Sequence, residues 1–250
     1  MKMINIMAEW RQYVAESEVA GREQEEIEQN YPETVAMAQH YHRDQVRRSS
    51  GMPYVQHPKE VAAIIKRYYQ NEQSVTPEVF SQMMNVALLH DTVEDAHKNL
   101  PDDLARAKRK LDSLKAQGAI SDASYNQRMD QISQDAQIRV MHDIGSEHGM
   151  SVLSDVQSLS HEESMTYSQY VSAISDDPIL IRVKLADMLH NSSDLSAPAG
   201  WDPKTFVCRD DLKGWEKYRC ALMGLIEIHG GKPEPVAEAH WSELKKAFNL

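Results

Sequence analysis

The chain has little cysteine and no long apolar run. Its two cysteines, Cys208 and Cys220, are not spaced as a CxxC pair. So few cysteines cannot build a disulfide framework, and the sequence predicts reduced thiols in a reducing compartment. No stretch approaches the ~18 apolar residues of a membrane span, and the first residues lack the apolar core of a signal peptide. We therefore expect a soluble, cytoplasmic protein with no membrane partner.

Positive charge is also scarce. The 250 residues include 27 Lys and Arg against 38 Asp and Glu, which gives a net charge of -11. A surface for nucleic acid would need a basic stripe, so no nucleic-acid partner is expected. If the protein binds a phosphorylated ligand, a few local cations must hold it against the acidic background.

The alternating pattern of β-strands is almost absent, whereas helical periodicity runs through most of the chain. The sequence therefore predicts an all-α fold with four parts. Residues 1–30 are a helical extension, 31–230 the main domain, 97–137 a helical hairpin inserted into it, and 231–250 a tail helix. The extension or the hairpin could serve as a homo-oligomer interface. The hairpin could equally be a lid or a solvated excursion.

The stretch 86–95 is the centre of the sequence, since four apolar residues lead into His90 and Asp91. Helical spacing would place His90 beneath Glu94, and Asp91 beneath Asp95. Burying several like charges is unfavourable unless a cation neutralises them or their pKa values rise. A divalent metal explains the pattern, and the alternative is a solvated acidic helix end with one surface histidine.

Two further segments carry candidate ligands. His57 precedes Pro58, which suits the first turn of a helix, so we expect His57 at or beside the N-cap. In the apolar segment 179–191, Lys184, Asp187 and Asn191 fall within about 60° of one another on a helical wheel. A charged side chain in so apolar a helix is rarely buried unless it is paired or binds metal, which makes Asp187 a further candidate ligand.

Three segments in this order resemble the HD phosphohydrolase superfamily. The first is 42–48 with 51–58, the second is 87–95 and the third is 184–191. Within the superfamily they are most similar to the hydrolase domain of RelA/SpoT proteins and to the small stand-alone alarmone hydrolases. This resemblance implies an HD-domain helical bundle that binds one divalent metal, typically Mn²⁺, and hydrolyses (p)ppGpp to GDP or GTP and pyrophosphate.

The resemblance also implies roles for single residues. The positions that match metal ligands are His57, His90, Asp91 and Asp187. Glu94 and Asp95 match the pair that positions or deprotonates the attacking water. The positions that match contacts to the guanosine nucleotide are Arg47, Lys184, Asn191 and, with a looser match, Tyr218. Arg48 is in a loop of variable length and matches less closely than Arg47.

One departure from the family pattern bears on the substrate. The family usually has an Arg shortly after its final Asn, but here the segment 191–195 reads Asn-Ser-Ser-Asp-Leu. Another substrate, such as a deoxynucleoside triphosphate or NADPH, therefore remains open. A catalytically idle module that binds nucleotide as a regulator is the third reading.

Overall fold

The computed structural model describes residues 21–47, 50–161 and 165–250, and in these ranges every regular element is a helix. The expected all-α fold is thus confirmed. The elements are α2 (Pro32–Tyr41), α3 (Gln56–Tyr69), α4 (Pro77–Leu89), η1 (Glu94–Lys98), α5 (Asp102–Ala116), α6 (Asp122–Ser158), α7 (Tyr167–Ala173), α8 (Pro178–Ser192), α9 (Gly214–His229) and α10 (Glu238–Ala247). No helix in the described ranges is both long and apolar enough to cross a membrane.

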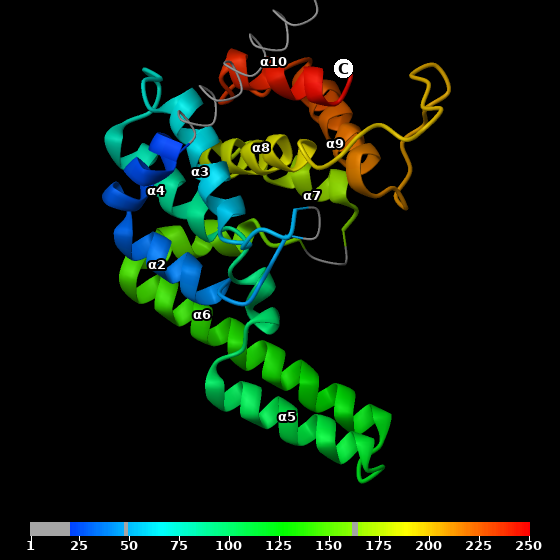
Figure 1. Cartoon of the computed structure of the whole chain (residues 1–250). Coiled ribbons are helices and arrows are strands. Elements are labelled where there is room, and N and C mark those ends of the chain that lie inside the picture. Colours follow the sequence, from blue (N-terminus) through cyan, green and yellow to red (C-terminus); the bar gives the residue numbers. More distant parts are fainter. Residues whose placement is uncertain (1–20, 48–49, 162–164) are drawn as a thin grey trace, which may run out of the picture.

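Helices α3, α4 and α8 form the centre of the molecule, and each packs against the other two (Figure 1). Their contact is apolar, because Ile65, Leu88 and Leu185 are fully buried. Helix α8 begins where Asp177 accepts hydrogen bonds from two backbone N–H groups, and Pro178 occupies its first position. The three elements that carry the predicted metal ligands are therefore held by one common core.

Residues 21–30 are helical and lie along α3. Ile27 is buried, Lys59 pairs with Glu28 at 2.7 Å, and Arg67 pairs with Glu23 at 3.2 Å. This part of the predicted extension covers the core of its own chain. Residues 1–20, the rest of that extension, lie outside the described residues.

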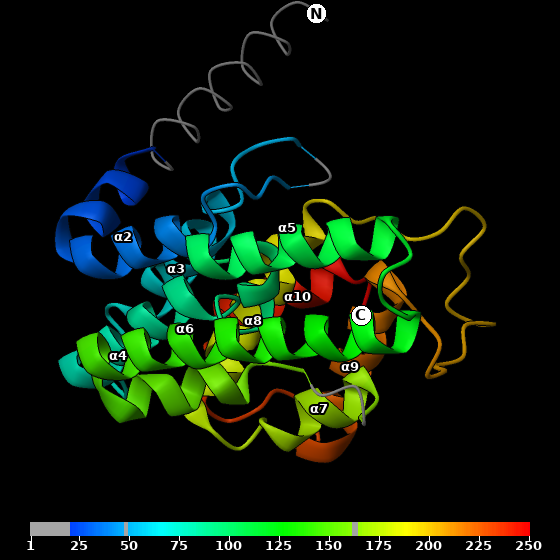
Figure 2. The ribbon, with the colours of Figure 1, turned by 90° about the horizontal axis from the view of Figure 1, so that it is seen from below.

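Helix α5 and the first part of α6 form a hairpin that projects from the body and whose two arms run side by side (Figures 1 and 2). Its seam is thin and apolar, and the Ser121 hydroxyl caps the second arm by accepting a hydrogen bond from the Ser124 N–H. The seam residues Leu104, Leu111, Ile132 and Ala136 are buried.

The predicted end of the hairpin at 137 is wrong. Helix α6 is 37 residues long and continues past 137 into the body, with a break in its backbone at Gly149, where φ is 85°. Val140 and Ile144 are buried beyond the seam, and they carry the apolar face of the arm onto the core without a loop.

The C-terminal helices close the other side of the body. Helix α9 ends at His229, and its C-cap Gly230 has a left-handed φ of 64°. Helix α10 packs against α8, and its Trp241 and Leu244 are buried. Helix α10 lies within 231–250, the range of the predicted tail helix.

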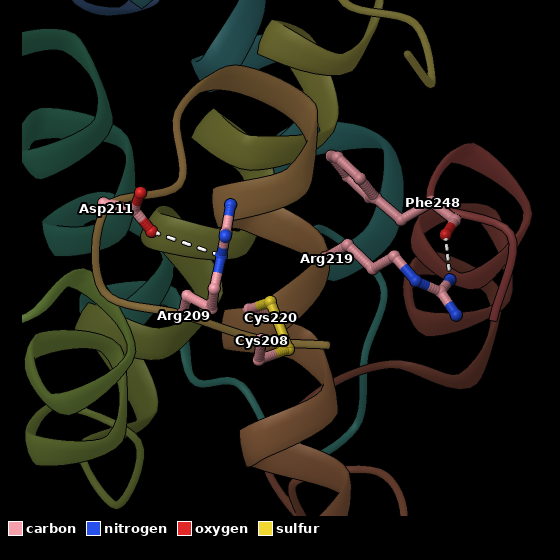
Figure 3. Close-up of a disulfide and its surroundings, with 6 residues drawn as sticks. All are labelled: Cys208, Arg209, Asp211, Arg219, Cys220 and Phe248. Carbon is pink, nitrogen blue, oxygen red and sulfur yellow. Dashed lines mark hydrogen bonds and ion pairs between the residues drawn. A yellow bond between two sulfur atoms is a disulfide. The ribbon is translucent and has the colours of Figure 1, made fainter. Parts of the chain in front are cut away.

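The prediction of two reduced thiols is wrong, because Cys208 and Cys220 form a disulfide with a Cα–Cα distance of 5.6 Å (Figure 3). Cys208 lies in the loop between α8 and α9, and Cys220 lies in α9. The loop turns back along the helix and brings the two residues together. Counting cysteines could not reveal this pairing, since it depends on where the loop returns.

We expect the Cys208→Ser substitution to lower the melting temperature. Closing a loop of this length stabilises a protein by about 3 kcal/mol, which corresponds to roughly 6–12 °C for a chain of this size. Calorimetry of the single variants C208S and C220S and of the double variant measures the effect. The melting temperatures of all three variants should fall by the same amount. Rapid reaction of exposed Cys208 with a thiol reagent in the untreated protein would contradict the disulfide.

Candidate metal centre

Helix α4 ends at Leu89, so His90 is its C-cap. The His90 ring Nδ1 lies 2.8 Å from the Ala87 carbonyl, and the Thr92 hydroxyl donates to the Leu89 carbonyl at 2.6 Å. These side chains occupy carbonyls that a further α-helical turn would use, and the chain tightens into the 3-10 helix η1. The expected stacking of His90 beneath Glu94 in one continuous α-helix is therefore wrong.

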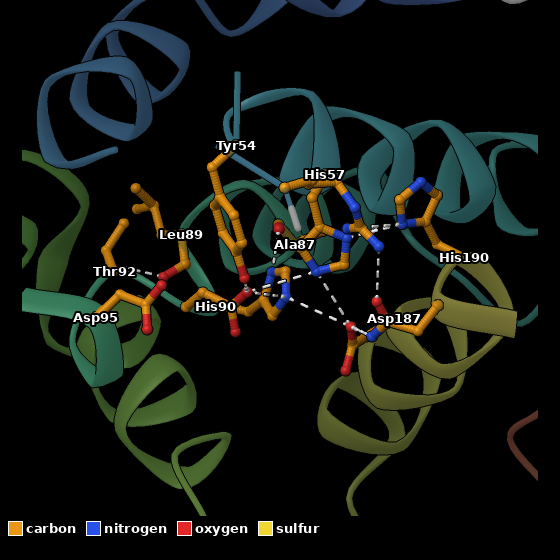
Figure 4. A network of polar contacts seen from close by, with 12 residues as sticks. Tyr54, His57, Ala87, Leu89, His90, Thr92, Asp95, Asp187 and His190 are labelled. Atoms are coloured by element: carbon orange, nitrogen blue, oxygen red, sulfur yellow. Dashed lines mark hydrogen bonds and ion pairs between the residues drawn. The ribbon is translucent and has the colours of Figure 1, made fainter. Parts of the chain in front are cut away.

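His57 lies in the first turn of α3 and is followed by Pro58, as its sequence context predicts. The N-cap itself is Val55, two positions earlier than expected. The imidazole is almost fully buried. Its backbone position in this rigid first turn directs the ring toward α4 and α8 (Figure 4).

The four predicted ligands come together from α3, the end of α4 and α8. His57 Nε2 lies 3.4 Å from Asp91 Oδ2 and 3.2 Å from Asp187 Oδ1. His90 Nε2 lies 3.2 Å and 3.8 Å from the same two atoms. Potential ligand atoms of His57, His90 and Asp91 all lie within 4.8 Å of one another, close enough to hold one cation.

The hydrogen bond on the far side of His90 fixes its tautomer. A carbonyl only accepts, so His90 Nδ1 carries a proton, and in the neutral ring the lone pair is on Nε2. This buried Nε2 has no hydrogen-bond partner in the described part of the chain, although it faces two carboxylates. A buried nitrogen lone pair oriented in this way fits a metal ligand.

His190 supports His57 in the same manner, and sequence reasoning assigned it no role. The two Nδ1 atoms are 2.7 Å apart. Burial, followed by the nearby charges of His57 and Arg47, lowers the pKa of His190 to about 3. Its neutral ring therefore accepts a hydrogen bond from the Nδ1–H group of His57. The only signal in the sequence is its place beside Asn191 in the third matched segment.

Both carboxylates of the cluster stay ionised. Burial raises the pKa of Asp91, but His90 and His57 together outweigh this effect and hold the pKa well below its ordinary value. Burial likewise raises the pKa of Asp187, and Lys184 together with the two imidazoles outweighs it and lowers the pKa. Tyr54, which sequence reasoning also missed, donates to Asp91 Oδ2 at 2.6 Å. Two buried anions held this way are an oxygen-rich site for a divalent cation.

Glu94 and Asp95 lie next to the cluster in η1. Glu94 is exposed, and its pKa is raised, first by loss of surrounding water and then by repulsion from Asp91. Asp95 is buried, and its Oδ1 pairs with Lys98. Its Oδ2 has no hydrogen-bond partner within the described ranges. Both carboxylates are placed to accept a proton beside the cluster.

A cleft of about 810 Å³ opens beside the cluster. Three of the four predicted substrate contacts, Arg47, Asn191 and Tyr218, line it. Asn191 donates to Asp187 Oδ1 at 2.6 Å, which links the cleft wall to the cluster. Lys184 is held further inside, where its Nζ pairs with Asp187 Oδ2 at 3.0 Å. The predicted common face of Lys184, Asp187 and Asn191 is therefore confirmed.

Arg47 is fixed at the rim of this cleft by its contacts with the end of α8. Its guanidinium donates to Asn191 Oδ1 at 3.1 Å and also pairs with Asp194. Arg48, the neighbouring candidate, lies outside the described residues. The Asp194 carboxylate therefore stands just beyond the final Asn of the matched segment and offsets the charge of Arg47.

The chain matches no model of a known protein family. Among curated proteins it is similar to the GTP pyrophosphokinase rsh of Brucella melitensis, with 27% identity over 152 residues. The matched region is 60% of this chain but only 15% of that relative. The similarity is distant and partial, and it is consistent with a relation to the hydrolase domain of RelA/SpoT proteins.

Lys217 is a further cleft residue that sequence reasoning did not single out. Its Nζ lies 4.1 Å from the centre of the Tyr167 ring and 4.8 Å from that of Tyr218. Burial and the nearby charge of Lys184 lower its pKa. Its position next to Tyr218 in α9 was the available signal, but the sequence did not show that α9 packs against α7.

We expect cation binding to strengthen as pH rises. Burial lowers the pKa of His90, but Asp91 outweighs this effect and raises it to about 9, so below that pH a cation must displace a proton. His57 shifts in the same direction, because hydrogen bonds to Asp187 and Asp91 outweigh its burial. Affinity for Mn²⁺ should increase from pH 6 to about 9, with proton release, as measured by calorimetry in buffers of different ionisation enthalpy. Binding that is independent of pH and releases no proton would exclude the two imidazoles as ligands.

Proposed function

We propose that the protein is a divalent-metal-dependent phosphohydrolase of the HD type that removes the 3′-pyrophosphate of (p)ppGpp. The observation that carries this proposal is the buried group of His57, His90 and Asp91, with Asp187 in contact, at the edge of a cleft lined by Arg47 and Asn191. The assignment of these side chains as ligands, and of the hairpin as an insertion in an HD bundle, is part of the proposal.

Different residues of the chain would bind the metal and accept the proton. His57, His90, Asp91 and Asp187 would hold the metal, and their mixture of imidazole and carboxylate suits Mn²⁺, Fe²⁺ or Zn²⁺. When bound, such a cation increases the acidity of water and offsets charge on a phosphoryl oxygen. Glu94, with its raised pKa, or Asp95 accepts the proton from the attacking water.

The reaction consumes one water molecule. The water oxygen bonds to the phosphorus of the 3′-pyrophosphate that is attached to O3′. The bond from that phosphorus to O3′ breaks, and O3′ takes up a proton. The products are GDP or GTP and pyrophosphate. Arg47 and Lys217 in the cleft provide cations for the phosphates, while Asn191 and Tyr218 provide donors for phosphate or sugar oxygens.

The choice of a guanosine nucleotide is supported by the resemblance of the three segments and by the partial similarity to a protein named GTP pyrophosphokinase. Only a small part of that relative is matched, so the activity in its name is not carried over to this chain. The other proposed properties are a cytoplasmic location and a possible homo-oligomer through the N-terminal extension or the hairpin.

A second candidate function changes the substrate and keeps the metal group. Asp194 pairs with Arg47 at the place where the family pattern has an Arg, so the cleft has one carboxylate more and one cation fewer than that pattern. This difference disfavours the most highly charged substrates and favours another nucleotide, such as a deoxynucleoside triphosphate or NADPH.

Product analysis distinguishes the two candidates. We expect the purified protein with Mn²⁺ to release GDP and pyrophosphate from ppGpp, and a chelator to abolish the release. Deoxynucleoside triphosphates and NADPH serve as parallel substrates under the same conditions. Cleavage of one of these with intact ppGpp would retain the metal group and reject the alarmone. Bound metal without any cleavage would favour a regulatory, nucleotide-binding module.

Paired variants separate metal binding from proton transfer. The Asp187→Ala substitution should abolish Mn²⁺ binding and turnover together, because it removes a buried anion of the cluster. The double substitution of Glu94→Ala and Asp95→Ala should retain the metal and reduce turnover by about 10²–10⁴-fold, the usual contribution of a general base. Metal content and initial rate are measured on the same samples. A double variant with near-normal turnover would show that another group accepts the proton.

A further inference from the structure

A second, smaller cavity lies at the base of the hairpin, between the loop after α2, η1 and α5. Its volume is about 390 Å³, which is within the usual range for sites that bind small ligands. Four cationic side chains and two carboxylates line this cavity, which we call the hairpin notch. The cations are Arg43, Lys98, Lys108 and Arg109, and the carboxylates are Asp44 and Asp102.

The notch gathers four cations in a chain whose net charge is -11. Three of them are paired with carboxylates that an anion would have to displace: Arg43 with Asp44 at 3.6 Å, Lys98 with Asp95, and Lys108 with Asp112. Arg43 is held in place by two hydrogen bonds, to the His40 carbonyl and the Leu100 carbonyl, each of 3.1 Å. These bonds join the end of α2 to the segment before α5. The guanidinium is thereby oriented before any ligand arrives, which reduces the entropy lost on binding.

The other wall of the notch is one face of α5. Asp102, Ala105, Lys108 and Arg109 lie three or four residues apart, so they share that face. The small Ala105 leaves space between the helix and η1. Lys108 pairs with Asp112 at 2.8 Å, and Arg109 extends the basic edge toward solvent.

Lys98 joins the notch to the candidate centre, because it lines both this cavity and the large cleft. Its Nζ pairs with Oδ1 of Asp95, one of the two proposed proton acceptors. An anion in the notch would compete with Asp95 for this ammonium. Loss of the ion pair releases Oδ1 of Asp95, so that both oxygens of this carboxylate are available beside the cluster.

We propose that the hairpin notch binds a small phosphoanion of two or three phosphates and that this binding raises turnover through Lys98. The binding step stands on the notch alone, and its effect on turnover rests on the proposed function. Four cations around one small cavity, one of them fixed in advance, favour a compact and highly charged anion over an extended polymer.

The test measures the binding of pyrophosphate by equilibrium dialysis. Mg²⁺ is present in excess, so that the free Mg²⁺ concentration stays constant. Arg109→Glu should weaken one class of site by about tenfold to a hundredfold, because it removes a charge-assisted contact and adds repulsion. Lys110→Glu is the matched control, since this exposed neighbour on α5 makes the same charge change outside the notch. Arg47→Ala should leave this class of site intact and weaken any binding in the cleft.

Equal affinities in Arg109→Glu, Lys110→Glu and the unchanged protein would overturn the proposal. So would binding of a single-stranded oligonucleotide in place of pyrophosphate with the same dependence on Arg109.

The second experiment compares hydrolysis rates with and without pyrophosphate. Activation in the unchanged protein that is lost in Arg109→Glu, with the same basal rate, supports the coupling. Binding that depends on Arg109 but causes no activation would reject the proposed effect on turnover. Binding at the notch without hydrolysis of any substrate would reject only the proposed function.

Discussion

The structure depends on the convergence of two carboxylates, partly buried Asp91 and buried Asp187, on two imidazoles. Like charges in a protein interior are tolerated only where cations or donors surround them, and here each carboxylate has several. Tyr54 donates to one, while Lys184 and Asn191 donate to the other. These neighbours keep both groups ionised and direct their oxygens at the same small volume. The imidazoles are oriented from behind by a carbonyl and by His190.

This arrangement needs rigid supports, and the apolar contact of α3, α4 and α8 provides them. Each helix contributes a candidate ligand at a defined point: a first turn, a C-terminus and a mid-helix position. The abrupt end of α4 is part of the construction, because side-chain bonds to its last carbonyls turn the chain away after His90 and place Glu94 and Asp95 in a separate short helix. The candidate ligands and the candidate proton acceptors thus come from one continuous segment but lie on differently directed elements.

The hairpin, the disulfide-linked loop and α9 surround this centre without adding to the cluster itself. The hairpin continues a helix of the body, so its base is fixed even though its tip projects outward. The loop that precedes α9 is fastened by Cys208 to the helix that presents Lys217 and Tyr218 to the cleft. The hairpin and the disulfide-linked loop thus lie beside cavities that contain charged side chains. Lys98 lines two of these cavities, the large cleft and the hairpin notch.

Local sequence was enough to predict the helical class and the shared face of Lys184, Asp187 and Asn191, because each depends on neighbours within one or two helical turns. The resemblance of three short segments brought His57, His90 and Asp187 into one hypothesis, although spacing alone could not. Three other features could be found only in the folded chain: the contacts of His190 and Tyr54 with the cluster, the position of Lys217 in the cleft, and the Cys208–Cys220 pair. Those contacts join elements far apart in the chain, and no local pattern encodes the path by which the chain returns.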